Sequence, residues 1–205
     1  MNPLATRGGT VILGILLAIL VTFALNGGNF HLNGIEITVW IHAIVGIAWV
    51  GLLFYFNAVQ IPAVGQALAD GGAGPGPAAI NKYVAPRALF WFRWAAVLTW
   101  LTGVSGLAQV GGGMQGIHLA FTFNNFSFNG PMAVLGMGAW LGTIMLFNVW
   151  VLIWPNQKKI LGIVQATPEE IAKAKSVALI ASRTNTALAF PMLLGMTGYA
   201  HGLLF

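Results

Sequence analysis

The chain contains no cysteine and few charged residues. Because none of its 205 residues is a cysteine, disulfides, thiolate metal clusters, thiol nucleophiles and covalent haem attachment at a C-x-x-C-H motif are excluded. Only 6% of the residues are charged, whereas 58% are hydrophobic, and the mean hydropathy is +0.82. A soluble domain of this length and composition would expose far too much apolar surface, so we predict an integral membrane protein.

Charge is also missing from the middle of every long apolar segment. These segments are near the ~20 residues that cross a bilayer. The absence argues against a proton pump or an ion-coupled transporter, which normally needs an ionisable group at that depth. We predict an all-α, polytopic membrane helix bundle of about five transmembrane helices, in a single domain over residues 1–205. The expected spans are 10–25, 35–58, 89–110, 132–154 and 184–205.

The first and the last spans each have a second feature. Arg7 followed by a short apolar run also fits a signal peptide, although no small-x-small cleavage site follows Leu25. Before the last span, Thr167 followed by Glu169 and Glu170 has the pattern of a helix N-terminus. We therefore expect a separate helix at the inner membrane surface ahead of residue 184.

Basic residues lie in alternate connections between the predicted spans. By the positive-inside rule, this pattern predicts a cytoplasmic N-terminus and an outer C-terminus, in the bacterial inner (cytoplasmic) membrane. We therefore attribute the net charge of +5 to the orientation of the chain in the membrane, where membrane lipids are its expected partners. The charge does not indicate a nucleic-acid partner. The residues that define the pattern are Arg7, Lys82, Arg87, Lys158, Lys159, Lys173 and Lys175.

Four histidines fall on the outer half of this predicted bundle. His42 lies inside the second span and His201 near the end of the fifth, while His31 and His118 lie in the adjoining connections. With a rise of ~1.5 Å per residue, His42 and His201 lie roughly 10 Å and 6 Å inside the outer boundary. An imidazole at depth is costly unless it is hydrogen-bonded or bound to a metal, so the pair predicts a shared ligand.

Small residues flank both deep histidines. His42, Gly46 and Trp49 share one helical face, and Gly198 lies beside His201. This pattern predicts a low-spin haem b whose iron is ligated by His42 and His201, with Gly46, Trp49 and Gly198 in contact with the cofactor. Such ligation suits electron transfer. Close helix packing with hydrogen-bonded histidines explains the spacing equally well, and no catalytic residue is identified.

Other small and polar residues predict helix contacts. Gly138 and Gly142 form a small-x-x-x-small pair on the fourth span, and Thr102, Ser105 and Gln109 share a face of the third. We interpret both sets as packing features, since such residues let membrane helices approach and hydrogen-bond to one another.

Arg93 lies at the inner end of the third span within an aromatic belt. Aromatic side chains at this level typically anchor a helix at the headgroup region. A lipid phosphate or a helix C-terminus is therefore the expected partner of the guanidinium. The belt consists of Phe90, Trp91, Phe92, Trp94, Trp150 and Trp154.

Several segments after residue 35 resemble the membrane domain of the bacterial membrane-bound urate hydroxylase family. They are WIHAIVGIAWVG at 40–51 with 54–56, WFRW at 91–94 with 99–103, NVW at 148–150 with 155–158, and 183–191. The segment around His42 also resembles, more faintly, the haem-binding helix of small membrane protoporphyrinogen oxidases. The resemblance implies a membrane scaffold, urate oxidation with electrons passed to the respiratory chain, and an outer cytochrome c domain, whose C-x-x-C-H motif this sequence lacks.

Three functions remain open at this point. The first is a haem b protein that transfers electrons, alone or as a subunit of a larger respiratory-type redox complex. The second is an oxidoreductase of the urate hydroxylase type. The third is a structural membrane subunit without a cofactor.

Overall fold

The computed structural model describes residues 2–203, and this part of the chain contains helices but no strand. The chain divides into two compact units, residues 1–37 and 38–205. The first unit contains a short 3-10 turn, η1 (Pro3–Ala5), and the helix α1 (Arg7–Leu25). Thr6 caps α1 by accepting a hydrogen bond from the Gly9 N–H. None of the described residues of α1 is buried.

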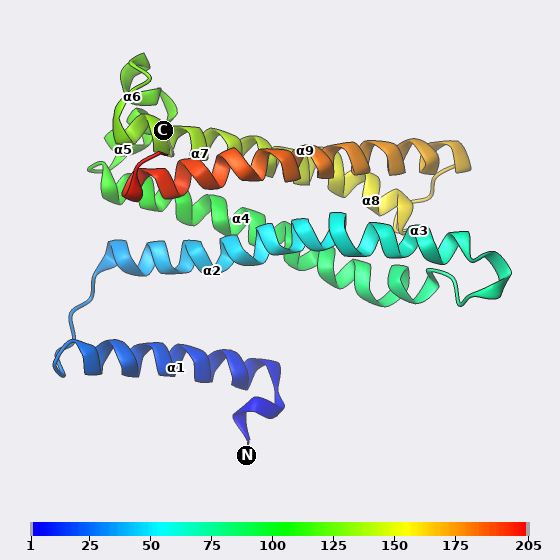
Figure 1. Cartoon of the computed structure of the whole chain (residues 1–205), viewed down its shortest axis with the longest axis horizontal. Helices are drawn as coiled ribbons and strands as arrows, with labels where there is room; N and C mark the ends of the chain where they lie inside the picture. The colour runs from blue at the N-terminus through cyan, green and yellow to red at the C-terminus, as the bar shows by residue number, and fades with distance from the viewer. Residues whose placement is uncertain (1, 204–205) are drawn as a thin grey trace. The chain divides into compact units, whose positions relative to one another are not determined.

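The second unit is built on long helices that run side by side (Figure 1). Its first helix consists of α2 (Gly34–Tyr55) from residue 38 onward, the π-helical turn η2 (Phe56–Gln60) and α3 (Ile61–Ala69). The helix α4 (Ala85–Val110) follows the π-helical turn η4 (Ile80–Val84). The next long helix contains α7 (Gly130–Phe147), the π-helical turn η5 (Asn148–Ile153) and α8 (Trp154–Ile160), and α9 (Pro168–His201) is the last. The shorter elements are η3 (Gly71–Ala73), α5 (Met114–Phe121) and α6 (Phe123–Phe126).

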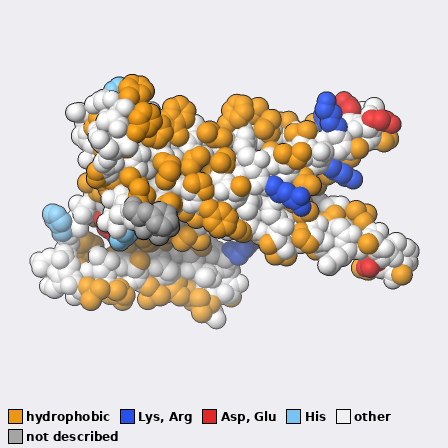
Figure 2. Space-filling view, turned by 45° about the horizontal axis from the view of Figure 1, so that its top comes forward, with side chains coloured by type: hydrophobic (Ala, Val, Ile, Leu, Met, Phe, Trp, Pro, Cys, Tyr) orange, Lys and Arg blue, Asp and Glu red, His pale blue; other side chains and the backbone are white. Residues whose placement is uncertain are grey.

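Four of these helices are long and apolar enough to cross a membrane, which supports the predicted all-α membrane fold. They are Arg7–Leu25, Gly34–Ala69, Gly130–Ile160 and Pro168–His201. The predicted span 89–110 lies within α4, which is 26 residues long. Apolar side chains cover much of the molecular face in Figure 2, as a lipid-facing surface requires. The number of crossings and their orientation stay predictions.

The expectation of a separate helix ahead of residue 184 is wrong, because α9 is one continuous helix of 34 residues. The helix start at Thr167 is confirmed by a capping box, in which Thr167 and Glu170 exchange side-chain and backbone hydrogen bonds. Small residues such as Ala174 and Ala178 then bury one face of the following turns. No helix-breaking signal separates this segment from the apolar part, and the helix also continues through Pro191.

Close glycine contacts hold α7 and α9 together. A Cβ atom added to Gly195 would lie 2.6 Å from the Gly138 nitrogen, and one added to Gly138 would lie 2.8 Å from the Met196 Cε. The two backbones therefore approach more closely than any larger residue at these positions allows. The packing interpretation of Gly138 is confirmed.

The core of the second unit lies where its long helices meet. Aromatic side chains from η2 and α4 pack together there, as in the edge-to-face pair of Phe56 and Phe92, whose ring centroids are 5.4 Å apart. The largest fully buried side chains are Trp49, Phe92, Leu53, Met145, Val149 and Asn185.

Candidate functional site

His42 is hydrogen-bonded to α4 through Thr102. The Nδ1 atom of this half-buried histidine lies 3.0 Å from the Thr102 Oγ1. The Thr102 hydroxyl lies 2.7 Å from the Leu98 carbonyl oxygen and 3.1 Å from that of Thr99, and both oxygens can only accept. Since a hydroxyl has one proton, Thr102 donates to a carbonyl and accepts from the Nδ1–H of His42. In the neutral form of this ring, Nε2 then carries the lone pair.

The side of α2 that carries His42 packs directly against α4. A Cβ atom added to Gly103 would lie 3.1 Å from the His42 Cε1, and one added to Gly46 would lie 3.8 Å from the Thr99 Cγ2. Trp49 is only 2% exposed and belongs to the core. The Cβ atom at Gly46 would make only an ordinary van der Waals contact, so packing against α4 does not require a glycine there, and the expected cofactor contacts of Gly46 and Trp49 stay predictions.

His201 has different surroundings at the end of α9. Its side chain is exposed, and among the described residues it has no hydrogen-bond or ion-pair partner in the structure. Gly198 faces α7, because a Cβ atom there would lie 3.1 Å from the Val134 Cγ1 and 2.9 Å from the Leu203 side chain. Ligation of one metal by His42 and His201 stays a prediction.

The other two histidines are exposed. His118 lies on α5, where its carbonyl accepts hydrogen bonds from Thr122, and His31 lies in the first unit. Within residues 2–203, no group of three or more histidine, cysteine, aspartate or glutamate side chains is placed to hold a metal ion. The expected haem site would therefore depend on two imidazoles rather than on a larger ligand cluster.

Two π-helical turns connect to a single turn of α9 through asparagine side chains, which the sequence analysis missed. Asn148 and Asn185 are buried, and Asn57 is half-buried. In η2, the Asn57 Nδ2 donates to the Ser182 Oγ at 2.8 Å. In η5, the Asn148 Nδ2 donates to the Asn185 Oδ1 at 2.8 Å, and the Asn185 Nδ2 donates to the Met145 carbonyl at 3.0 Å. A π-helical turn carries one extra residue and redirects side chains, and such turns are frequent at functional sites. The sequence offers one signal that could have indicated these contacts, which is the presence of polar residues such as Asn57 and Asn148 within apolar segments.

Arg93 forms a second polar centre, on α4. Its guanidinium carbon lies 3.3 Å from the Trp154 ring centroid, and its Nε and Nη1 are buried without a hydrogen-bond partner. Trp94 packs edge-to-face on Trp150 with ring centroids 5.7 Å apart, so the aromatic residues at this level hold α4 against η5 and α8. The Lys158 Nζ lies 5.9 Å from the same Trp154 ring.

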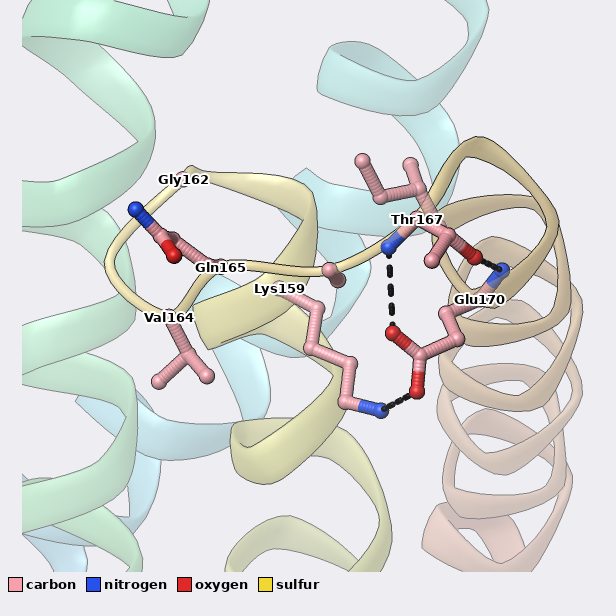
Figure 3. A pocket seen from close by; sticks show the side chains of 8 residues that line it. Lys159, Gly162, Val164, Gln165, Thr167 and Glu170 are labelled. Carbon is pink, nitrogen blue, oxygen red and sulfur yellow. Dashed lines mark hydrogen bonds and ion pairs between the residues drawn. The ribbon is translucent and has the colours of Figure 1, made fainter.

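A surface pocket of about 580 Å³ lies where α8 leads into α9 (Figure 3). The Lys159 Nζ is 3.4 Å from the Glu170 Oε1, and the Glu170 Oε2 accepts from the Thr167 N–H at 3.0 Å. Lys159 and Glu170, which line the pocket, are therefore paired with each other, and Glu170 also caps the N-terminus of α9. We interpret this pocket as part of the helix start rather than as a binding site.

Comparison with known proteins finds one similarity, which lies in the second half of the chain. Residues 109–205 match the family model described as urate oxidase N-terminal. The matched region contains α7, α8 and α9, including the Asn148–Asn185 contact and His201, whereas His42 and Arg93 precede it. No curated protein and no solved structure matches the chain. The resemblance to the urate hydroxylase membrane domain is thus confirmed for these residues.

Proposed function

We propose that this chain is a membrane redox module. Two observations support this proposal: residues 109–205 match the urate oxidase N-terminal family model, and the His42 ring is hydrogen-bonded to Thr102. In this proposal it transfers electrons through a haem b in a system of the urate hydroxylase type. The observation that carries the proposal is the His42–Thr102 hydrogen bond. A histidine that ligates a metal typically donates its other ring N–H to a fixed acceptor, which orients the ring.

The residues present fit one axial ligand well. Thr102 accepts from Nδ1–H, so Nε2 is the nitrogen that would bind iron. His201 is the proposed second ligand, and its exposed imidazole has no hydrogen bond among the described residues that ligation would have to break. When bound, a bis-histidine haem supplies reversible one-electron transfer without an open site for oxygen. Neighbouring helices of mostly apolar residues would exclude water from this site.

Haem retention by single histidine variants tests this function. The full chain is purified from membranes with haem supplied during expression, and bound haem is measured from the reduced-minus-oxidised absorption spectrum. We expect His42→Ala to lose bound haem and His118→Ala to retain it, because His118 is exposed on α5. Equal retention by the two variants would refute the role of His42. Helical circular dichroism should stay unchanged, since insertion depends on the apolar spans.

The family match favours a second function, oxidation of urate by the chain itself. Residues 1–205 contain no C-x-x-C-H motif, so electrons would leave through a redox partner outside these residues. We therefore expect the isolated chain to show no urate-dependent reduction of a quinone or of added cytochrome. If such reduction were observed, the chain would be the enzyme rather than a module of it.

A further inference from the structure

Two cations share one indole ring where α4 meets α8. Arg93 stacks on Trp154 at 3.3 Å from its ring centroid, and Lys158, four residues further along, places Nζ 5.9 Å from the same centroid. Stacking on an indole stabilises one cation, but two like charges near one ring repel each other in a medium of low dielectric constant. An anion bound between or beside them would remove this repulsion.

No carboxylate of the described residues provides that anion. The ion pair that the structure contains joins Lys159 to Glu170, and neither Arg93 nor Lys158 has an ion-pair partner within residues 2–203. The Nε and Nη1 of Arg93 are also buried without an acceptor. An anion cannot reach these two enclosed atoms, so it would bind the remaining Nη2, where it would neutralise a charge that has no carboxylate partner in an apolar environment.

The position of this pair along the helices indicates the ligand. Arg93 lies about 12 Å from the start of α4, and Trp154 about 9 Å from the end of α8, at ~1.5 Å per residue. Phe90, Trp91 and Trp94 are exposed beside Arg93, at 48%, 62% and 45% of their surface. Exposed aromatic side chains in a membrane helix mark the headgroup level, where lipid phosphates lie.

We propose that Arg93 and Lys158 bind the phosphate of an anionic membrane lipid. Trp154 holds the guanidinium in place. Because Arg93 is only partly buried, the accessible part of its guanidinium lies at the surface of the bundle. A soluble phosphate compound offers the same chemistry, but the exposed aromatic side chains around the pair favour a lipid. The proposal is independent of the haem and of urate.

Lipid retention measured by native mass spectrometry tests this site. The full chain is reconstituted in zwitterionic nanodiscs with a minor fraction of phosphatidylglycerol, and tightly bound phosphatidylglycerol is counted after release. We expect Lys158→Gln to weaken binding about fivefold, the effect of one basic residue near anionic lipid, and Arg93→Gln to weaken it at least as much. The matched control is Lys82→Gln, because Lys82 is exposed and lies over the Tyr83 ring at 5.3 Å.

Each outcome decides the proposal. Loss of bound lipid in Lys158→Gln but not in Lys82→Gln supports it, whereas equal losses would show a general effect of surface charge and overturn it. Displacement of the lipid by inorganic phosphate would assign the site to a soluble anion and overturn the lipid as its occupant. If Arg93→Gln does not fold, Arg93→Lys keeps the charge without the planar stack, and we expect intermediate retention.

Discussion

The two deep histidines have different surroundings. His42 is half-buried, lies against the Gly103 backbone and donates to Thr102, while His201 is exposed at the end of α9 with no described partner. Orienting a side chain in advance reduces the entropy lost on binding. In the proposed haem site, contacts between α2 and α4 would orient His42 in advance, whereas His201 on α9 would become ordered only on ligation.

The prediction with the largest consequence for this comparison concerns the side of the membrane on which each histidine lies. If the alternation of basic connections sets the topology, Lys158 is protected from an external amine-reactive reagent in intact cells, and a tag at the C-terminus is accessible. Labelling of Lys158 before lysis, or a protected C-terminal tag, would separate His42 from His201 and break the comparison.

Removing the exposed histidine should change coordination rather than abolish binding. We expect His201→Ala to keep haem on His42 but to convert a six-coordinate low-spin spectrum to a five-coordinate or water-ligated high-spin one. Electron paramagnetic resonance of the oxidised protein distinguishes these states. Complete loss of haem would show that His201 contributes as much to binding as His42, and an unchanged low-spin spectrum would exclude His201 as a ligand.

Removing the hydrogen bond to His42 should have an intermediate effect. Thr102→Val keeps the shape of the side chain but takes away the acceptor for Nδ1–H, and loss of such a contact typically weakens metal binding 10- to 100-fold. A haem titration of the apoprotein measures this change. Thr197→Val is the matched control, because Thr197 donates to the Leu193 carbonyl of its own helix in the same way. Equal affinities of the two variants would contradict a role for Thr102.

A smaller effect is expected in the contact between α7 and α9, on which the position of His201 depends. Gly195→Ala introduces a Cβ atom 2.6 Å from the Gly138 nitrogen, so overpacking should lower the unfolding free energy by about 1–3 kcal/mol. In Gly142→Ala the added Cβ meets no atom within 4 Å, and we expect little change or a small gain from helix propensity. Denaturation in mild detergent compares the two, and equal stability would refute the close contact.

Composition and local patterns were enough to predict the helical membrane fold and the helix start at Thr167. Hydropathy did not predict that a single helix runs through residue 184, because it locates apolar segments, whereas a capped, alanine-rich helix continues regardless of its polarity. The π-helical turns at Asn57 and Asn148 could not be predicted, since one extra residue in a turn hardly changes the hydrophobic pattern.

The candidate site was predicted only in part. The grouping of Thr102 and Gln109 on one face of α4 indicated helix contacts, and the structure confirms them through His42 and through the Gln109–Thr38 hydrogen bond of 2.7 Å. Which residue Thr102 would meet depends on the rotation of α2 against α4, and spacing along one helix does not determine that rotation. The same limit applies to Arg93, whose stack on Trp154 joins residues 61 positions apart in the chain.

The absorption spectrum of the purified wild-type protein tests the central claim most directly. After expression with sufficient haem and iron, the account predicts about one haem b per chain, with the sharp α-band of a low-spin bis-histidine centre on reduction by dithionite. A correctly folded, fully helical preparation that binds no haem, even when haem is added, would contradict the account and leave His42 and Thr102 as a packing contact.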